Sequence, residues 1–155
     1  MGTLTVDNLN LKGSGSVSSV GRILQIVQTT KTDTFSTTST SFTDVTGFSA
    51  TITPSSTSSK VLVMVSSNSS TSGGNNAIMK LVRGSTDVFV GDDDGASREE
   101  ATAQTRVNDT NAALTLTFNF LDSPSTTSAT TYKLQYKVQA GTGTITVSYT
   151  HLRAH

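Results

Sequence analysis

The chain has 155 residues, of which 11 are basic and 11 are acidic, and it contains neither Cys nor Trp. Ser and Thr together make up 52 residues, whereas charged residues make up 14%, against about 25% in an average globular domain. No apolar stretch of about 20 residues exists to span a membrane, no Lys/Arg cluster indicates nucleic-acid binding, and the lack of Cys excludes disulfides and thiolate metal sites.

The first 20 residues differ in pattern from the rest of the chain. The opening segment MGTLTVDNLN has neither the basic region nor the apolar region of a secretory signal. We expect residues 1–12 to form an N-terminal arm, in which Leu4 and Val6 alternate as in a strand, and residues 13–20 to form a flexible Gly/Ser linker. One compact domain is expected from residue 21 to residue 146.

From residue 21 onward the pattern is typical of β-strands. Thr, Val, Ile and Phe recur at period two, turn clusters interrupt them every few residues, and no window shows sustained helical periodicity. The run 23–28 is apolar on both faces, which suits a strand buried inside a sandwich. The pattern predicts an all-β, antiparallel sandwich. The expected strands are 23–28, 42–53, 60–65, 77–83, 88–90, 101–107, 114–120, 132–138 and 144–146.

The last nine residues, VSYTHLRAH (147–155), hold both histidines of the chain. They resemble one reading frame of a transposase sequencing adapter, of the kind left on untrimmed metagenomic reads. In that frame residue 146 must be Ser, Pro, Thr or Ala, and it is Thr. We therefore expect residues 147–155 to be a non-native tail on a truncated gene, and we assign no role to His151 or His155; the alternative is a natural tail with two surface histidines.

The acidic cluster Asp92-Asp93-Asp94 is the weak candidate for a metal site. A hard cation such as Ca²⁺ takes several oxygen ligands, which a carboxylate-rich loop could supply. The order of an EF-hand is not met, because Gly95 comes too early in the loop. The alternative, a solvated turn whose charges protect a sheet edge, is favoured.

Residues for catalysis are scarce. Without the tail the chain has no His, and it has no Cys, which removes the usual nucleophilic schemes. The only glutamates, Glu99 and Glu100, are adjacent, and consecutive residues on a strand point to opposite faces. The Gly-rich segments at 13–15 and 141–143 lack the strand–helix context of a phosphate loop. We predict that the chain is not an enzyme and holds no cofactor.

The aromatic residues of the two clearest strands are expected in the core. Tyr132 and Tyr136 could stack on sugars if they were exposed, but their period-two spacing with Leu134 predicts buried rings. Phe118 and Phe120 are assigned to the core by the same rule.

Three segments carry a resemblance to a known family. FSTTSTSFTDVTGFSATITPSSTSSKVLVMVSS (35–67), KLVRGSTDVFVGD (80–92) and FLDSPSTTSATTYKLQYKV (120–138) are similar to short proteins of environmental, mainly marine, bacteriophages. The resemblance covers residues 21–146. It implies a jelly roll similar to tumour-necrosis-factor and complement-type heads, usually a homotrimer, at the end of a tail fibre or spike.

The function that the resemblance implies is host attachment by a non-enzymatic virion protein, made in the host cytoplasm. Its expected partners are other virion tail proteins and a host-surface glycan or protein, with no nucleic acid and no membrane insertion. The alternatives are a structural capsid or decoration protein and a secreted glycan-binding module. The loops that could contact a receptor are 32–41, 69–76, 91–100 and 122–130.

Such domains normally continue past residue 146 to a last strand that pairs beside the first. We therefore expect the jelly roll to lack its last strand, which would leave the first strand with unpaired backbone groups. We therefore expect this chain to be poorly soluble or not trimeric, and a chain with its natural C-terminus restored to be soluble and trimeric. Equal size-exclusion and melting behaviour of the two chains would refute this.

Overall fold

The computed structural model describes residues 23–72, 74–95, 99–106, 112–139, 144–148 and 150–155. The expected arm (1–12) and linker (13–20) lie outside these residues. The described part of the chain is all-β and contains no helix. Its strands are β1 (Val27–Lys31), β2 (Phe35–Thr37), β3 (Thr43–Ile52), β4 (Val61–Thr71), β5 (Asn76–Arg83), β6 (Thr86–Val88), β7 (Ala103–Arg106), β8 (Leu114–Asp122), β9 (Thr130–Val138), β10 (Ile145–Val147) and β11 (Thr150–Ala154).

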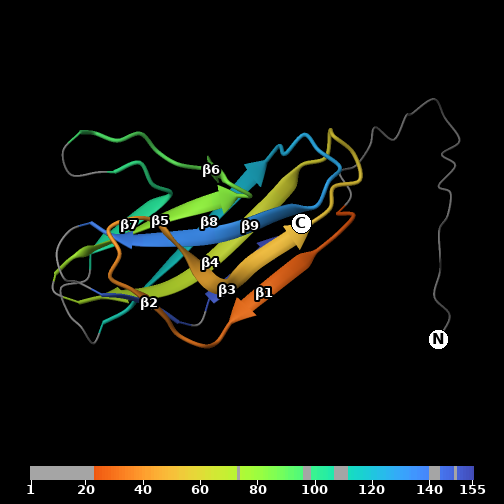
Figure 1. Ribbon diagram of the computed structural model, residues 1–155. Helices are drawn as coiled ribbons and strands as arrows, with labels where there is room; N and C mark the ends of the chain where they lie inside the picture. The colour runs from red at the N-terminus through yellow and green to blue at the C-terminus, as the bar shows by residue number, and fades with distance from the viewer. Residues whose placement is uncertain (1–22, 73, 96–98, 107–111, 140–143, 149) are drawn as a thin grey trace, which may run out of the picture.

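The strands form two antiparallel sheets, which pack face to face as a sandwich (Figure 1). The first sheet has the order β1-β11-β4-β10-β2, with β8 on the free side of β4. The second sheet has the order β3-β9-β5-β6, and β7 also pairs with β5. The chain crosses repeatedly from one sheet to the other, which is the winding of a jelly roll. The predicted antiparallel sandwich is confirmed.

Period-two alternation places the core between the sheets. In β4 every second residue is buried, and in β3 the inward residues are Phe48, Ala50 and Ile52, as predicted. Tyr132 and Tyr136 are also buried, as predicted. Phe118 and Phe120 are only partly buried, because β8 is an edge strand with a neighbour on one side. The buried apolar residues of the core between the sheets are Val45, Phe48, Ala50, Ile52, Val61, Val63, Val65, Ala77, Met79, Leu81, Val88, Tyr132, Leu134, Tyr136, Val138, Ile145, Val147, Leu152 and Ala154. Ile78 and Val82, which alternate with them along β5, are also buried.

The first strand departs from the prediction. We expected a buried strand over 23–28, but β1 begins at Val27, and Ile23, Leu24 and Ile26 are exposed. A strand that is apolar on both faces needs cover on both faces. At the edge of the first sheet β1 is covered only on its inner face. The apolar run therefore contributes exposed surface instead of core.

The place beside β1, which we expected to be empty, is occupied by β11. This strand pairs with β1 on one side and with β4 on the other, and the C-terminal residue adds two backbone hydrogen bonds to Leu62. Leu152 and Ala154 face the core and are fully buried, whereas Arg153 faces outward. A strand between β1 and β4 needs only alternating apolar and polar residues, and Leu152, Arg153 and Ala154 of β11 alternate in this way. The adapter origin of residues 147–155 stays a prediction.

Two polar bridges cross the interior between the sheets. At one end, Asp122 on β8 is 5% exposed and accepts hydrogen bonds from Arg83 on β5 (2.7 Å) and from the hydroxyl of Tyr132 on β9 (2.6 Å). Further along, the hydroxyls of Ser67 on β4 and Tyr136 on β9 are hydrogen-bonded at 2.8 Å. Each bridge satisfies buried polar groups that would otherwise oppose closure of the sandwich.

Replacing Leu152 by Ala should lower the free energy of unfolding by about 2–5 kcal/mol, because it removes a fully buried side chain from between β1 and β4. Urea unfolding followed by circular dichroism measures this. The matched control is Arg153→Ala, whose exposed side chain should change stability by less than about 0.5 kcal/mol. Equal, small effects of both changes would show that β11 does not contribute to the fold.

The two buried tyrosines should make stability fall at alkaline pH. Burial raises the pKa of Tyr136, and burial together with the hydrogen bond to Asp122 raises the pKa of Tyr132. Above the ordinary tyrosine pKa of about 10, the unfolded chain ionises while the folded chain does not, so unfolding releases protons and stability is lost as pH rises. The double variant Tyr132→Phe/Tyr136→Phe should show a shallower loss in urea titrations at alkaline pH. An identical slope would contradict this.

Candidate functional site: a polar groove beside strand β7

The acidic triplet lies in the connection from β6 to β7 and is exposed. The carboxylate of Asp93 accepts a hydrogen bond from the backbone N–H of Gly95 (2.6 Å), and Gly95 has a φ of +71°, so this segment is a tight turn. Asp92 lies beside a groove on the protein surface. Among the described residues, no three His, Asp or Glu side chains gather where they could hold a metal ion.

The end of the same connection returns to the outer face of the second sheet. Glu99 forms an ion pair with Lys137 of β9, and Glu100 lies 4.0 Å from Lys80 of β5. Both ammonium groups also lie over the ring of Phe42, at 4.7 and 5.0 Å from its centroid. The two glutamates lie in a loop, as the sequence predicts, and there the rule that neighbouring residues of a strand point to opposite faces does not apply, because both reach lysines of the same sheet. The sequence feature that could have predicted these ion pairs is the presence of lysines at outward positions of β5 and β9.

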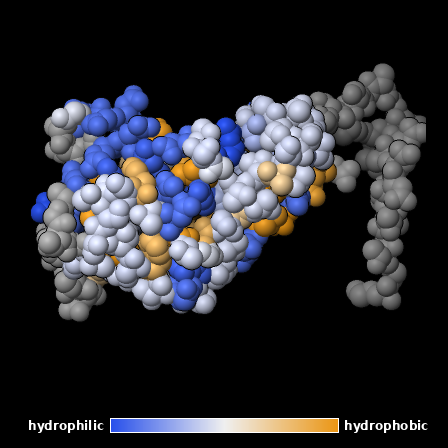
Figure 2. All heavy atoms as spheres, viewed as in Figure 1, coloured by the Kyte–Doolittle hydropathy of each residue, from blue (hydrophilic) through white to orange (hydrophobic). Residues whose placement is uncertain are grey.

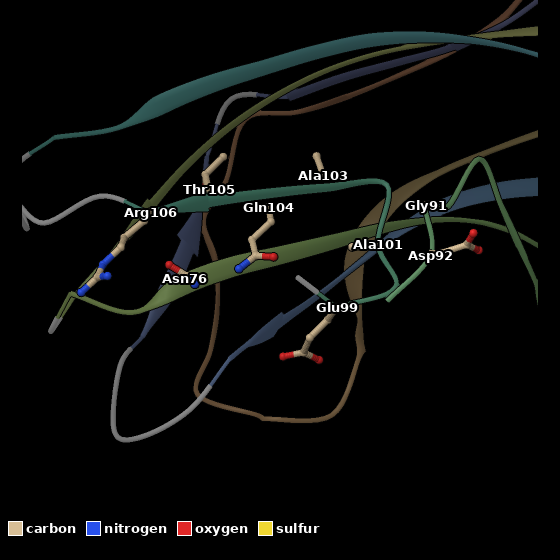
Figure 3. Close-up of a pocket in the computed structure, with 9 residues that line it drawn as sticks. All are labelled: Asn76, Gly91, Asp92, Glu99, Ala101, Ala103, Gln104, Thr105 and Arg106. Carbon is tan, nitrogen blue, oxygen red and sulfur yellow. The ribbon is translucent and has the colours of Figure 1, made fainter. Parts of the chain in front are cut away.

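The groove beside β7 has a volume of about 520 Å³. The backbone N–H of Gly91 donates to the carbonyl of Ala101 (3.0 Å). This hydrogen bond joins the beginning and the end of the loop that borders the groove. Figure 3 shows Arg106 at one end of the row of lining residues and Asp92 at the other. The groove is lined by Asn76, Gly91, Asp92, Glu99, Ala101, Ala103, Gln104, Thr105 and Arg106.

Strand pairing explains why polar groups converge there. Asn76 of β5 is opposite Arg106 of β7, and Gln104 is opposite Ile78, so Asn76, Gln104 and Arg106 share the outer side of the sheet. The side-chain amide of Asn76 donates to Gln139, which fixes its orientation. The groove therefore has amide and guanidinium groups on the paired strands β5 and β7, and carboxylates on the connection beside them. Sequence analysis identified only Asp92 and Glu99 of this set, because the pairing of β5 with β7 was not predictable.

A second cavity, of about 560 Å³, lies at another end of the sandwich and is mainly apolar. The exposed residues Ile23, Leu24 and Leu121 contribute to it. His155 also lines it, and both ring nitrogens of His155 are buried without a hydrogen-bond partner. The other histidine, His151, lies on β11.

The two outer faces of the sandwich differ in charge. The second sheet carries ion pairs of Lys80, Lys133 and Lys137, and hydrogen bonds from Lys133 and Gln135 lower the pKa of Asp44. Figure 2 shows strongly hydrophilic residues gathered where the connection from β6 to β7 lies. On the first sheet, Arg153 is the one charged side chain among the described outward residues. These are Gln28, Thr30, Ser36, Leu62, Met64, Ser66, Asn68, Ser70, Thr115, Thr117, Asn119, Leu121, Thr146 and Arg153.

An aromatic edge lies where β8 meets the connection after β6. The ring of Phe89 stacks on Phe120 at a centroid distance of 5.0 Å and contacts Phe118 at 5.7 Å. Phe89 is 45% exposed and has a φ of +55°, a backbone conformation that is costly for an aromatic residue. The structure thus holds an exposed phenyl group in a strained position at the open side of the sandwich.

Comparison with known proteins gives no name for this arrangement. No protein family is matched by the sequence, and no curated protein is similar to it. Among the described residues, no helix has the length and apolar character needed to cross a membrane.

Proposed function

We propose that this chain is the head of a bacteriophage tail fibre or spike, a non-enzymatic virion protein that contributes to attachment to the host surface. The observation that carries the proposal is the difference between the two outer faces. The first-sheet face, whose described outward side chains include one charged group, Arg153, suits packing against other virion subunits, and the second-sheet side, with its groove and charges, suits contact with a host. The sandwich fold agrees with the head domains that the sequence resembles.

The homotrimer is part of the same proposal. Interface cores are depleted of charged residues and enriched in aromatic ones. The first-sheet face has few charged residues, and the aromatic edge supplies the aromatic rings. Because these two surfaces differ, one copy would place its aromatic edge against the first-sheet face of the next. Contacts of this head-to-tail kind close into a ring when the rotation between neighbouring copies closes, and the proposed trimer requires such a closing rotation.

Attachment by such a head does not need one tight site. Several weak contacts act together when they are carried by three linked copies and by several fibres on one particle. A capsid or decoration protein would also use an uncharged face for packing, but it has no need of a polar groove. The groove therefore favours attachment over a purely structural role.

The virion location is tested by mass spectrometry of purified particles from a phage that carries this gene. We expect peptides from β4, β5 and β9 in tail-containing particles and their absence from tail-less heads. The comparison of the two fractions is the control. Absence of the protein from intact particles would refute the virion role, and its presence in tail-less heads would favour the capsid alternative.

The trimer should depend on Phe89. Light scattering after size exclusion should give a mass three times that of the 16.2 kDa chain. Phe89→Asn should shift the protein toward monomer with little change in melting temperature, because Asn tolerates positive φ and this relief offsets the lost stacking on Phe120. The control Ile23→Asn, at an exposed apolar residue outside the aromatic edge, should leave the mass unchanged. A trimer that persists in Phe89→Asn would contradict the proposed interface.

A further inference from the structure

The mainly apolar cavity of about 560 Å³ lies at the end of the sandwich where the described chain begins. Its aliphatic lining comes from segments that are distant in the sequence, namely the chain before β1, β4 and β8. Figure 2 shows hydrophobic surface at this end of the molecule. Large aliphatic side chains that gather in one hollow indicate a surface that another segment or a partner covers. The lining side chains that remain 37% to 69% exposed are Ile23, Leu24, Leu62 and Leu121.

The lysine beside this cavity narrows the choice of partner. Lys60 is exposed at the rim, and its ammonium group donates a hydrogen bond to the hydroxyl of Ser123 (2.6 Å). Among the described residues, no carboxylate pairs with Lys60. The ring nitrogens of His155 are buried, so Lys60 is the charged side chain that a partner meets. A matching partner places aliphatic side chains in the cavity and a carboxylate at its rim.

The N-terminal arm of this chain carries these groups in a suitable order. Residues 3–11, TLTVDNLNL, contain Asp7 as their one charged residue. Alternate residues of an extended segment share a face, so the sequence predicts Asp7, Leu9 and Leu11 on one side of the arm. That side therefore has a carboxylate followed by two leucines.

The chain also brings this segment to the cavity. Leu11 precedes Ile23 by 12 positions, and 12 residues span at most about 40 Å when they are extended. The sequence predicts a Gly/Ser linker over residues 13–20, and short linkers of this kind give effective concentrations in the millimolar range. A contact of modest intrinsic affinity is therefore occupied within one molecule.

We infer that residues 7–11 of the arm dock in this cavity of their own chain. Leu9 and Leu11 fill the cavity, and the carboxylate of Asp7 pairs with Lys60 at the rim. A cavity of about 150 Å³ holds a benzene molecule, so one of about 560 Å³ has room for both leucine side chains. The docked arm covers the exposed apolar end of the head, and this contact is independent of the proposed virion role.

Nuclear magnetic resonance of the full ¹⁵N-labelled chain with a nitroxide label tests the contact. Because the sequence has no Cys, Asn10→Cys gives a single labelling site, on the opposite face from Leu9 and Leu11. The label should strongly broaden the amide signal of Leu62 at the cavity. The signal of Ser70, about 26 Å away along β4, should stay sharp.

Two double variants of the labelled chain separate docking from the mere presence of the tether. Leu9→Asn/Leu11→Asn should reduce the broadening of Leu62 severalfold, because the two side chains that enter the cavity are no longer apolar. The matched control Leu4→Asn/Val6→Asn makes the same kind of change outside the docked segment and should leave the broadening unchanged.

The ion pair has a test of its own. Asp7→Lys places two cations beside each other and should reduce the broadening, whereas the exchange Asp7→Lys/Lys60→Asp should restore it. A role of Lys60 in the fold alone would not give this rescue. Failure of the exchange to restore the broadening would contradict the proposed position of the arm.

Two further results would overturn the inference. Equal broadening of Leu62 in the parent and in Leu9→Asn/Leu11→Asn would show that the tether alone brings the label near the cavity. In a mixture of ¹⁵N-labelled chains without nitroxide and unlabelled chains with it, no broadening is expected; broadening there would assign the cavity to the arm of another copy. Both outcomes leave the virion role intact, whereas absence of the protein from particles would refute that role without affecting docking of the arm.

Discussion

The buried carboxylate of Asp122 joins the two layers of this protein. It lies on β8 of the first sheet and accepts hydrogen bonds from Arg83 and Tyr132, which both belong to the second sheet, and from the backbone N–H of Ser123 beside it. A buried charge is tolerated only when it is paired and its remaining oxygen positions are satisfied. The two sheets are therefore held at one relative position, since sliding of one over the other would leave this group unpaired.

The same logic explains how a chain with so many hydroxyls forms a core. Most Ser and Thr side chains on the strands face outward, but Ser67, Ser69 and Thr71 face inward on the second half of β4. Tyr136 reaches across from β9 to bond with Ser67. The interior is thus apolar around Val61–Val65, apart from the Asp122 bridge at its end, and partly polar around Ser67–Thr71, where the hydrogen bond between Ser67 and Tyr136 joins the sheets.

The period of the sequence predicted the sandwich, most of its strands and the inward residues of β3 and β9, because alternation depends only on local spacing. Pairing between distant strands cannot be derived this way. The groove depends on β5 lying beside β7, and the ion pairs of Glu99 and Glu100 depend on a loop returning to that sheet. Lys31 shows the same limit: it is 4% exposed and paired with Asp33, next to the irregular pairing of β3 at Gly47, although lysine side chains are mostly exposed in folded proteins.

The slot between β1 and β4, which β11 fills, has a consequence for how copies of this protein assemble. Among the side chains of β11 that the structure describes, Leu152 and Ala154 face inward, and the strand is also stabilised by backbone hydrogen bonds, which depend little on its sequence. A slot with so few requirements does not depend on which chain supplies the strand. A neighbouring copy could insert its own β11 there, and exchanged strands would link the heads of one fibre without any change in the core that each head presents.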